Sequence, residues 1–123
     1  MLEVYGTNIT VEADTAIAFN GTSLKKGCTA ELESLNTIQL NKCGVYMVEF
    51  DASAAAANTI QLYKDGIAQP QAQATGTNPS FTTLVQVDRN NSDCCCSSPV
   101  NLQFLTTTAG TLTNANVCIT KIC

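Results

Sequence analysis

The chain of 123 residues predicts an all-β fold, a sandwich or barrel of about eight to ten antiparallel strands. Apolar and polar residues alternate along most of the chain, which is typical of half-buried strands. Turn residues interrupt this alternation about every ten residues. Four alanines at positions 54–57 have helical propensity, but such a run is too short to nucleate a helix. The length and the lack of any repeat or linker predict a single domain over residues 1–123.

The first third of the chain supplies short predicted strands. Residues 15–19 predict a strand that ends at the turn dipeptide Asn20-Gly21, and residues 28–32 and 37–40 predict two more. Residues 41–44 then turn the chain. Residues 1–15 contain no basic residue and no long apolar run, so they do not resemble a secretory signal. If Met1 is the natural start, we expect folding in the cytoplasm, where thiols stay reduced.

Residues 45–53 form the clearest predicted strand, and its first half is apolar on both faces. Val45 and Met47 begin one face. The opposite face carries Tyr46, Val48, Phe50 and Ala52. A monomeric sandwich would expose one of these faces, so we expect Val45 and Met47 to lie in an oligomer interface. The alternative is that the N-terminal segment of the same chain covers them.

The second half of the chain continues the pattern. Residues 58–64 and 67–69 flank Asp65-Gly66, which predicts a hairpin with a type I′ turn. Residues 81–87 predict a strand with Phe81, Thr83, Val85 and Val87 on one face. Residues 100–104 alternate cleanly, a turn follows at Ala109-Gly110, and residues 112–122 predict a long last strand with Ala115, Val117 and Ile119 on one side.

The charge pattern excludes several partners. The chain carries ten acidic and six basic residues, for a net charge of −4, and the basic residues are scattered. Nucleic acid is not expected as a partner, because phosphate binding needs a basic patch. A membrane-spanning helix is excluded because no window approaches the required apolar length.

Enzymatic activity is not expected. The chain has no histidine, so a Ser-His-Asp triad, a Cys-His pair and any histidine-ligated metal are unavailable. The pairs Glu49/Asp51 and Glu31/Glu33 could form a glycosidase site, but they lie on polar strand faces and no tryptophan offers a sugar platform. We interpret them as solvated surface, and we expect no cofactor.

Seven cysteines occur, and three of them are adjacent, at Cys94-Cys95-Cys96. A zinc site would use Cys94 and Cys96, which alternate to the same side of an extended chain, with help from other cysteines or a second subunit. Cross-links between distant positions or between chains are a second reading, and reduced thiols packed at an interface are the favoured one. The candidate cross-link or interface cysteines are Cys28, Cys43, Cys94, Cys95, Cys96, Cys118 and Cys123.

The loop before the triplet is a weaker metal candidate. Asp88 and Asp93, with the asparagines between them, place oxygen donors at alternate positions, as calcium would require. No loop pattern of a known calcium site accompanies them, so a solvated polar loop is the favoured interpretation.

Three segments in this order resemble the C1q and tumour-necrosis-factor-like jelly rolls of bacteria and phages. They are residues 40–48 (LNKCGVYMV), 60–66 (IQLYKDG) and 113–122 (TNANVCITKI). The resemblance covers residues 37–122 as a core and leaves residues 1–36 as N-terminal strands and an extension. The cysteine triplet followed by Ser-Pro-Val looks like phage and prophage members. The chain lacks the Gly-X-Y stalk of the collagen-like spore-surface members.

The resemblance implies a jelly-roll sandwich assembled as a homotrimer, with one sheet of each subunit facing the three-fold axis. It also implies a structural protein of a virion surface, a capsid decoration or cement protein or a head fibre. Its partners would be the major capsid protein or other virion proteins, and a host glycan. The alternative is a spore-surface or cell-surface domain of the same fold that serves adhesion or carbohydrate binding.

Overall fold

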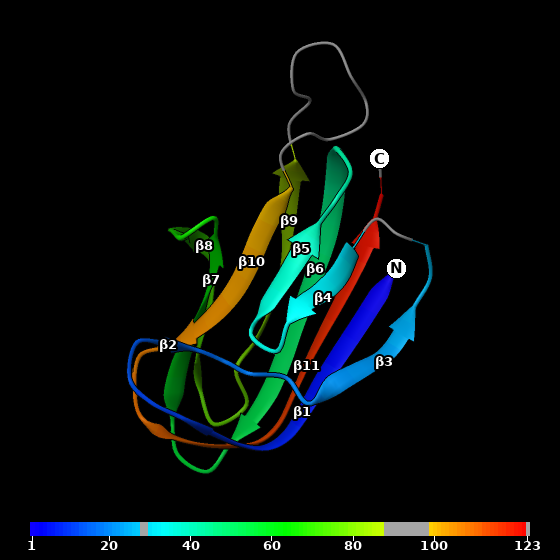
Figure 1. Ribbon diagram of the computed structural model, residues 1–123. Coiled ribbons are helices and arrows are strands. Elements are labelled where there is room, and N and C mark those ends of the chain that lie inside the picture. Colours follow the sequence, from blue (N-terminus) through cyan, green and yellow to red (C-terminus); the bar gives the residue numbers. More distant parts are fainter. Residues whose placement is uncertain (28–29, 88–98, 123) are drawn as a thin grey trace.

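The computed structural model describes residues 1–27, 30–87 and 99–122, and within these ranges the chain forms eleven strands and no helix. The strands form two sheets with antiparallel pairing throughout, and the sheets face each other as the layers of a sandwich (Figure 1). The predicted all-β class is therefore confirmed.

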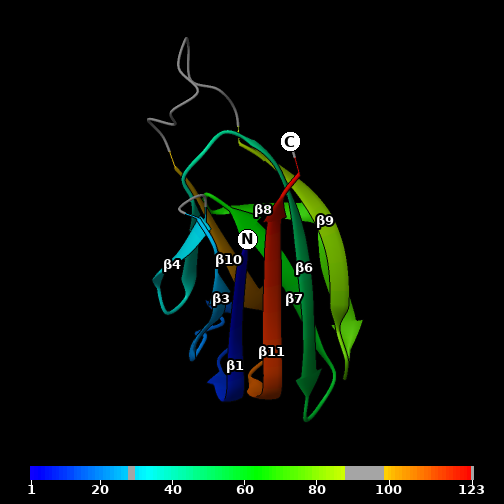
Figure 2. The same cartoon turned by 90° about the vertical axis from the view of Figure 1, so that its right-hand side faces the viewer.

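Sheet A is the layer seen from its outer side in Figure 2. Across the sheet its strands are β3 (Gly21–Lys25), β1 (Leu2–Val11), β11 (Gly110–Lys121), β6 (Gly44–Ala54) and β9 (Ser80–Val87). The central strand is β11, which pairs with β1 on one side and with β6 on the other. Both ends of the sequence therefore meet in the middle of this sheet.

Sheet B is the opposite layer. Across the sheet its strands are β4 (Ala30–Ser34), β5 (Thr37–Leu40), β10 (Val100–Thr106), β7 (Asn58–Lys64) and β8 (Ile67–Gly76). A further strand of two residues, β2 (Thr15–Ala16), pairs with the end of β10. Sheet B thus contains the predicted hairpin and the strands predicted at 28–32, 37–40 and 100–104, of which residues 28–29 lie outside the described residues.

The hairpin around Asp65-Gly66 is confirmed. Both turn residues have positive φ, 51° for Asp65 and 81° for Gly66, as a type I′ turn requires. The turn is also bonded to the start of β10, because the Asp65 carboxylate accepts from the Asn101 backbone N–H at 2.8 Å and the Asp65 N–H donates to the Asn101 carbonyl at 2.8 Å. The aspartate therefore ties the hairpin to its neighbouring strand.

The prediction at Asn20-Gly21 was wrong, because these residues do not turn the chain. Gly21 begins β3, and the backbone N–H of Asn20 donates to the carbonyl of Tyr5 at 2.8 Å. The predicted strand at 15–19 is also wrong in extent, since regular pairing covers only Thr15–Ala16. Ile17 and Phe19 are nevertheless buried and hydrogen-bonded to other segments.

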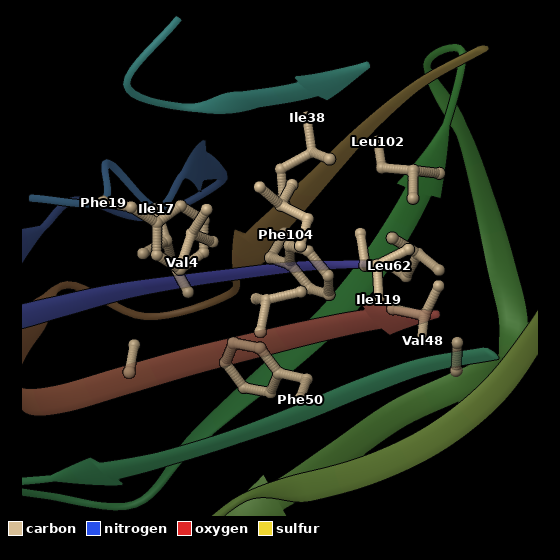
Figure 3. Packing of buried hydrophobic residues seen from close by; sticks show 14 of the residues in the cluster. Val4, Ile17, Phe19, Ile38, Val48, Phe50, Leu62, Leu102, Phe104 and Ile119 are labelled. Atoms are coloured by element: carbon tan, nitrogen blue, oxygen red, sulfur yellow. The ribbon is translucent and has the colours of Figure 1, made fainter. Parts of the chain in front are cut away.

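The core lies between the two sheets and is built around four phenylalanines. Phe104 of β10 stacks on Phe50 of β6 with ring centroids 5.0 Å apart, and it meets Phe19 edge to face at 6.2 Å (Figure 3). Phe81 of β9 stacks on Phe50 at 5.3 Å. Because Phe104 belongs to sheet B and Phe50 to sheet A, this cluster joins the two layers.

The predicted inward faces are confirmed by burial. The following residues are all buried: Tyr46, Val48, Phe50 and Ala52 on β6, Thr83, Val85 and Val87 on β9, and Ala115, Val117 and Ile119 on β11. Phe81 is partly buried and packs against the same core. Successive side chains of a strand point to opposite sides, so the residues between these face away from the core.

Candidate functional site

The outer face of sheet A is the most distinctive described surface of the molecule. We define it by the strand residues that alternate with the core positions. These are Leu24 on β3, Glu3 and Tyr5 on β1, Asn116, Cys118 and Thr120 on β11, Val45, Met47, Glu49 and Asp51 on β6, and Thr82, Leu84 and Gln86 on β9. The pairing register places them in rows that run across the sheet.

One end of this outer face is apolar. Met47 pairs with Leu84 on β9, and Val45 one row further pairs with Gln86. Leu84 is 57% exposed, and Val45 and Met47 are half-buried. Ile122 joins them, because its backbone N–H donates to the Val45 carbonyl at 2.8 Å and its side chain is 48% exposed. We call Val45, Met47, Leu84 and Ile122 the apolar end of the outer face.

The described N-terminal residues do not lie over Val45 and Met47. Strand β1 lies within the plane of sheet A, where β11 separates it from β6, and β3 lies further out beside β1 (Figure 2). The alternative in which the N-terminal segment covers this face therefore finds no support in residues 1–27. The role of Val45 and Met47 in an interface remains a prediction.

The centre of the outer face is acidic. Cys118 on the middle strand pairs with Glu3 on one side and with Glu49 on the other. Asp51 lies two residues beyond Glu49 on the same face of β6. Glu3 accepts a hydrogen bond from the Ser23 hydroxyl at 2.7 Å, whereas Glu49 and Asp51 are exposed. Three carboxylates thus share one side of the sheet with a thiol between two of them.

This setting raises the pKa of the Cys118 thiol. Partial burial is the main cause, and the negative charges of Glu3 and Glu49 add to it, because all three disfavour a thiolate. A hydrogen bond with the Thr120 side chain and the positive N-terminus act in the opposite direction. The thiol therefore stays protonated near neutral pH, which is unlike an activated nucleophile.

The cysteine predictions divide into two groups. Cys28, the triplet Cys94-Cys95-Cys96 and Cys123 lie outside the described residues, as do the metal candidates Asp88 and Asp93. Cys43 precedes β6, and Cys118 faces Glu49 near the middle of that strand. About 20 Å of extended backbone separates the two positions, which is too far for a disulfide between them.

The carboxylate pairs show no arrangement for catalysis. Glu31 is engaged with Lys25, whose ammonium lies 3.5 Å away, and with the side-chain amide of Asn41 at 3.4 Å. Glu49 and Asp51 border a shallow hollow between β6 and β9. Within residues 1–27, 30–87 and 99–122, no three acidic or sulfur side chains come together as metal ligands would. In the same ranges, no helix could span a membrane.

Sequence reasoning missed Leu84 and Glu3 as members of this face. Leu84 is an apolar residue between Thr82 and Gln86 on the otherwise polar side of β9, whose inward face was predicted correctly. This exception could have marked Leu84 as a candidate interface residue. Glu3 could not be placed because β1 itself was not predicted. Only the register of three strands that are far apart in sequence brings Glu3, Cys118 and Glu49 into one row.

No protein-family model matches the sequence, and no curated protein matches it as a relative. Solved structures do match. The globular domain of a zebrafish complement 1qA protein is similar over 99% of this chain and 96% of its own, with a TM-score of 0.72 and 10% identity. PRD1 vertex protein P5 is similar over 99% and 96%, with a TM-score of 0.68 and 12% identity.

Murine APRIL is a third match, over 98% of this chain and 97% of its own, with a TM-score of 0.63 and 10% identity. At such identities the likeness establishes the fold and not the function. The fold is thus a jelly roll of the C1q/TNF-like type, as the resemblance implied.

Proposed function

We propose that this protein is a non-enzymatic structural protein of a virion surface that assembles as a homotrimer through the outer face of sheet A. The likeness of its fold to PRD1 vertex protein P5 and to C1q and TNF-like domains supports a structural role. The resemblance of its sequence to phage and prophage jelly rolls favours the virion. A capsid decoration or cement protein, or a head fibre, bound to the major capsid protein or another virion protein, fits this proposal.

The observation that carries the proposal is the apolar end of the outer face. The Leu84 side chain is 57% exposed and lies next to Met47, which is half-buried. Burial of exposed apolar side chains against another copy of the chain is favourable, because it removes their surface from water. In the assembly that the resemblance implies, one sheet of each subunit faces the three-fold axis, and sheet A presents this surface.

The trimer is tested by light scattering with Leu84→Gln and a matched control, Ile67→Gln. Ile67 is 68% exposed on the hairpin of sheet B, outside the proposed interface. Covering Leu84 contributes about 1–2 kcal/mol per copy, or about 3–6 kcal/mol for three copies, so Leu84→Gln is expected to lower the trimer association constant by roughly 100-fold to 10,000-fold. Ile67→Gln is expected to leave it unchanged. A wild-type protein that stays monomeric at micromolar concentration would contradict the trimer.

The place on a virion is tested by mass spectrometry of purified particles from a host that carries the gene. We expect the protein among the external components, released by mild treatment that leaves the capsid intact. Neighbouring sporulation genes, together with the absence of the protein from particles, would instead favour the spore-surface or cell-surface alternative. Binding of the purified protein on a glycan array would add a host glycan to its partners.

A further inference from the structure

The outer face of sheet A combines its apolar end with negative charge at its centre. Glu49 and Asp51 are exposed on β6, and Glu3 lies two strands away on β1. Two strand spacings correspond to about 10 Å, and two residues along a strand to about 7 Å. In an isolated subunit the high dielectric constant of water weakens the repulsion across such separations, which are comparable to the Debye length of about 8–10 Å at physiological salt.

No positive side chain among the defined outer-face residues offsets these carboxylates. Beside them lie Tyr5, Cys118 and side chains of β3 and β9 that carry no positive charge. The Lys25 ammonium is directed to Glu31 of β4 at 3.5 Å. The N-terminal ammonium of Met1 donates to the Lys26 carbonyl at 3.0 Å and is the positive group whose field reaches Cys118. Among the described residues, the defined outer face therefore carries three carboxylates. The ammonium groups that the structure places near it are the N-terminus and that of Lys64, which donates to the Gln86 carbonyl at 2.7 Å.

Covering this face changes the balance. When copies pack over the apolar end, the neighbouring carboxylates lose solvent and approach the same groups of the other copies. Like charges repel more strongly as water is excluded, and the neutral form of a carboxyl group is then favoured. An assembled state that favours the neutral form must take up protons when it forms.

We propose that association through the outer face of sheet A is linked to proton uptake by Glu49, Asp51 and Glu3, so that the assembly is tightest in mildly acidic solution and loosens as the pH rises. This inference rests on the proposed homotrimer. The direction of the pH dependence follows from linkage. If the assembled state binds more protons than the separate subunits, it becomes more stable as the pH falls and less stable as the pH rises.

The test measures association of the full chain by sedimentation velocity from pH 5 to pH 8, at constant ionic strength and with a chelator present. The wild-type association constant is expected to fall about tenfold or more for each pH unit over part of this range. Glu49→Gln combined with Asp51→Asn is expected to associate more tightly at pH 8 and to lose most of the pH dependence.

The matched control is Glu12→Gln combined with Glu33→Gln. It removes the same two charges, but Glu12 lies beyond the end of β1 and Glu33 lies on β4 of sheet B. The control is expected to keep the wild-type pH dependence, and an equal loss in both double variants would overturn the inference. A trimer whose affinity does not vary with pH would overturn it too, while leaving the proposed function intact. A chain that stays monomeric at every pH would overturn the proposed function itself.

Discussion

Cys118 shows how one residue reports on the whole outer face. It lies on the central strand of sheet A, between Glu3 and Glu49, and the pKa of its thiol is raised by burial and by those two carboxylates. Its reactivity therefore depends on the charge of its neighbours and on whether another copy covers the sheet. The rate at which a thiol-specific reagent modifies Cys118 therefore measures both effects.

Substitution of Glu49 by glutamine is expected to speed alkylation of Cys118. Removing one of the two negative neighbours lowers the pKa of the thiol and raises the thiolate fraction at pH 8 by roughly twofold to threefold. The rate is measured by mass spectrometry of the peptide that contains Cys118, at a dilution where light scattering shows monomers.

Glu33→Gln serves as the control, because Glu33 lies on β4 in the other sheet. It is expected to leave the alkylation rate unchanged. Equal rates for the wild type and Glu49→Gln would show that the carboxylate does not act on the thiol. At concentrations that favour the trimer, slower alkylation of the wild type is expected because the outer face is covered.

Among the elements, the β7–β8 hairpin depends most clearly on one glycine. Gly66 has φ of 81°, a conformation that costs a residue with a Cβ atom about 1–2 kcal/mol. No heavy atom lies within 4 Å of a Cβ added there, so the cost of a side chain is one of backbone conformation alone.

Gly66→Ala is expected to lower the free energy of unfolding by about 1 kcal/mol or more. Gly110→Ala is the control, because Gly110 also has open space around it but does not have a left-handed φ. It is expected to change stability by less than about 0.5 kcal/mol. Urea denaturation of both variants at equal protein concentration measures the difference, and equal effects would contradict the assignment of the cost to the turn.

Strand β1 shows why one element escaped prediction. Leu2 and Val4 alternate correctly, but the next apolar inward residue is Ile9, so the phase shifts at Asn8, which has φ of 52°. Gly6 occupies the inward position between them, and the Ile9 side chain fills the space where a Cβ of residue 6 would lie. Such a change of phase breaks the period on which strand prediction depends.

Other elements were predictable because their signals are local. The hairpin at Asp65-Gly66 and the inward faces of β6, β9 and β11 follow from turn chemistry and from alternation within one segment. The acidic row was not predictable, because it depends on the register between strands from the start, the middle and the end of the chain. The apolar residues on both faces at the start of β6 drew attention to the outer face of sheet A. That Leu84 belongs to the same apolar end could be seen only from the pairing of β6 with β9.

At the scale of the whole molecule, the N-terminal strands belong to the core. The resemblance set residues 1–36 apart from a core at 37–122, yet four residues of β1 are buried between the sheets: Leu2, Val4, Ile9 and Val11. Each buried aliphatic side chain contributes about 1.5–3 kcal/mol, and their sum is comparable to the 5–15 kcal/mol that stabilises a typical domain.

A chain that starts at residue 37 is therefore expected to lose cooperative thermal unfolding and near-ultraviolet circular dichroism. Addition of a peptide that spans residues 1–27 is expected to restore part of the signal by rebuilding β1 and β3 beside β11. A truncated chain that melts cooperatively near the wild-type temperature would show that residues 37–122 fold alone.

The pairing of β1 with β11 also sets an order of events in time. Among the described strands β1 is made first and its partner β11 last, and β11 is also the partner that β6 needs within sheet A. Contacts between such distant segments form slowly, since the ends of a long chain must find each other first. Until β11 has been synthesised, β1 and β6 each have one strand edge without its partner. We therefore expect the sandwich to form only after β11 has left the ribosome. Chaperone binding is expected to matter most in that interval.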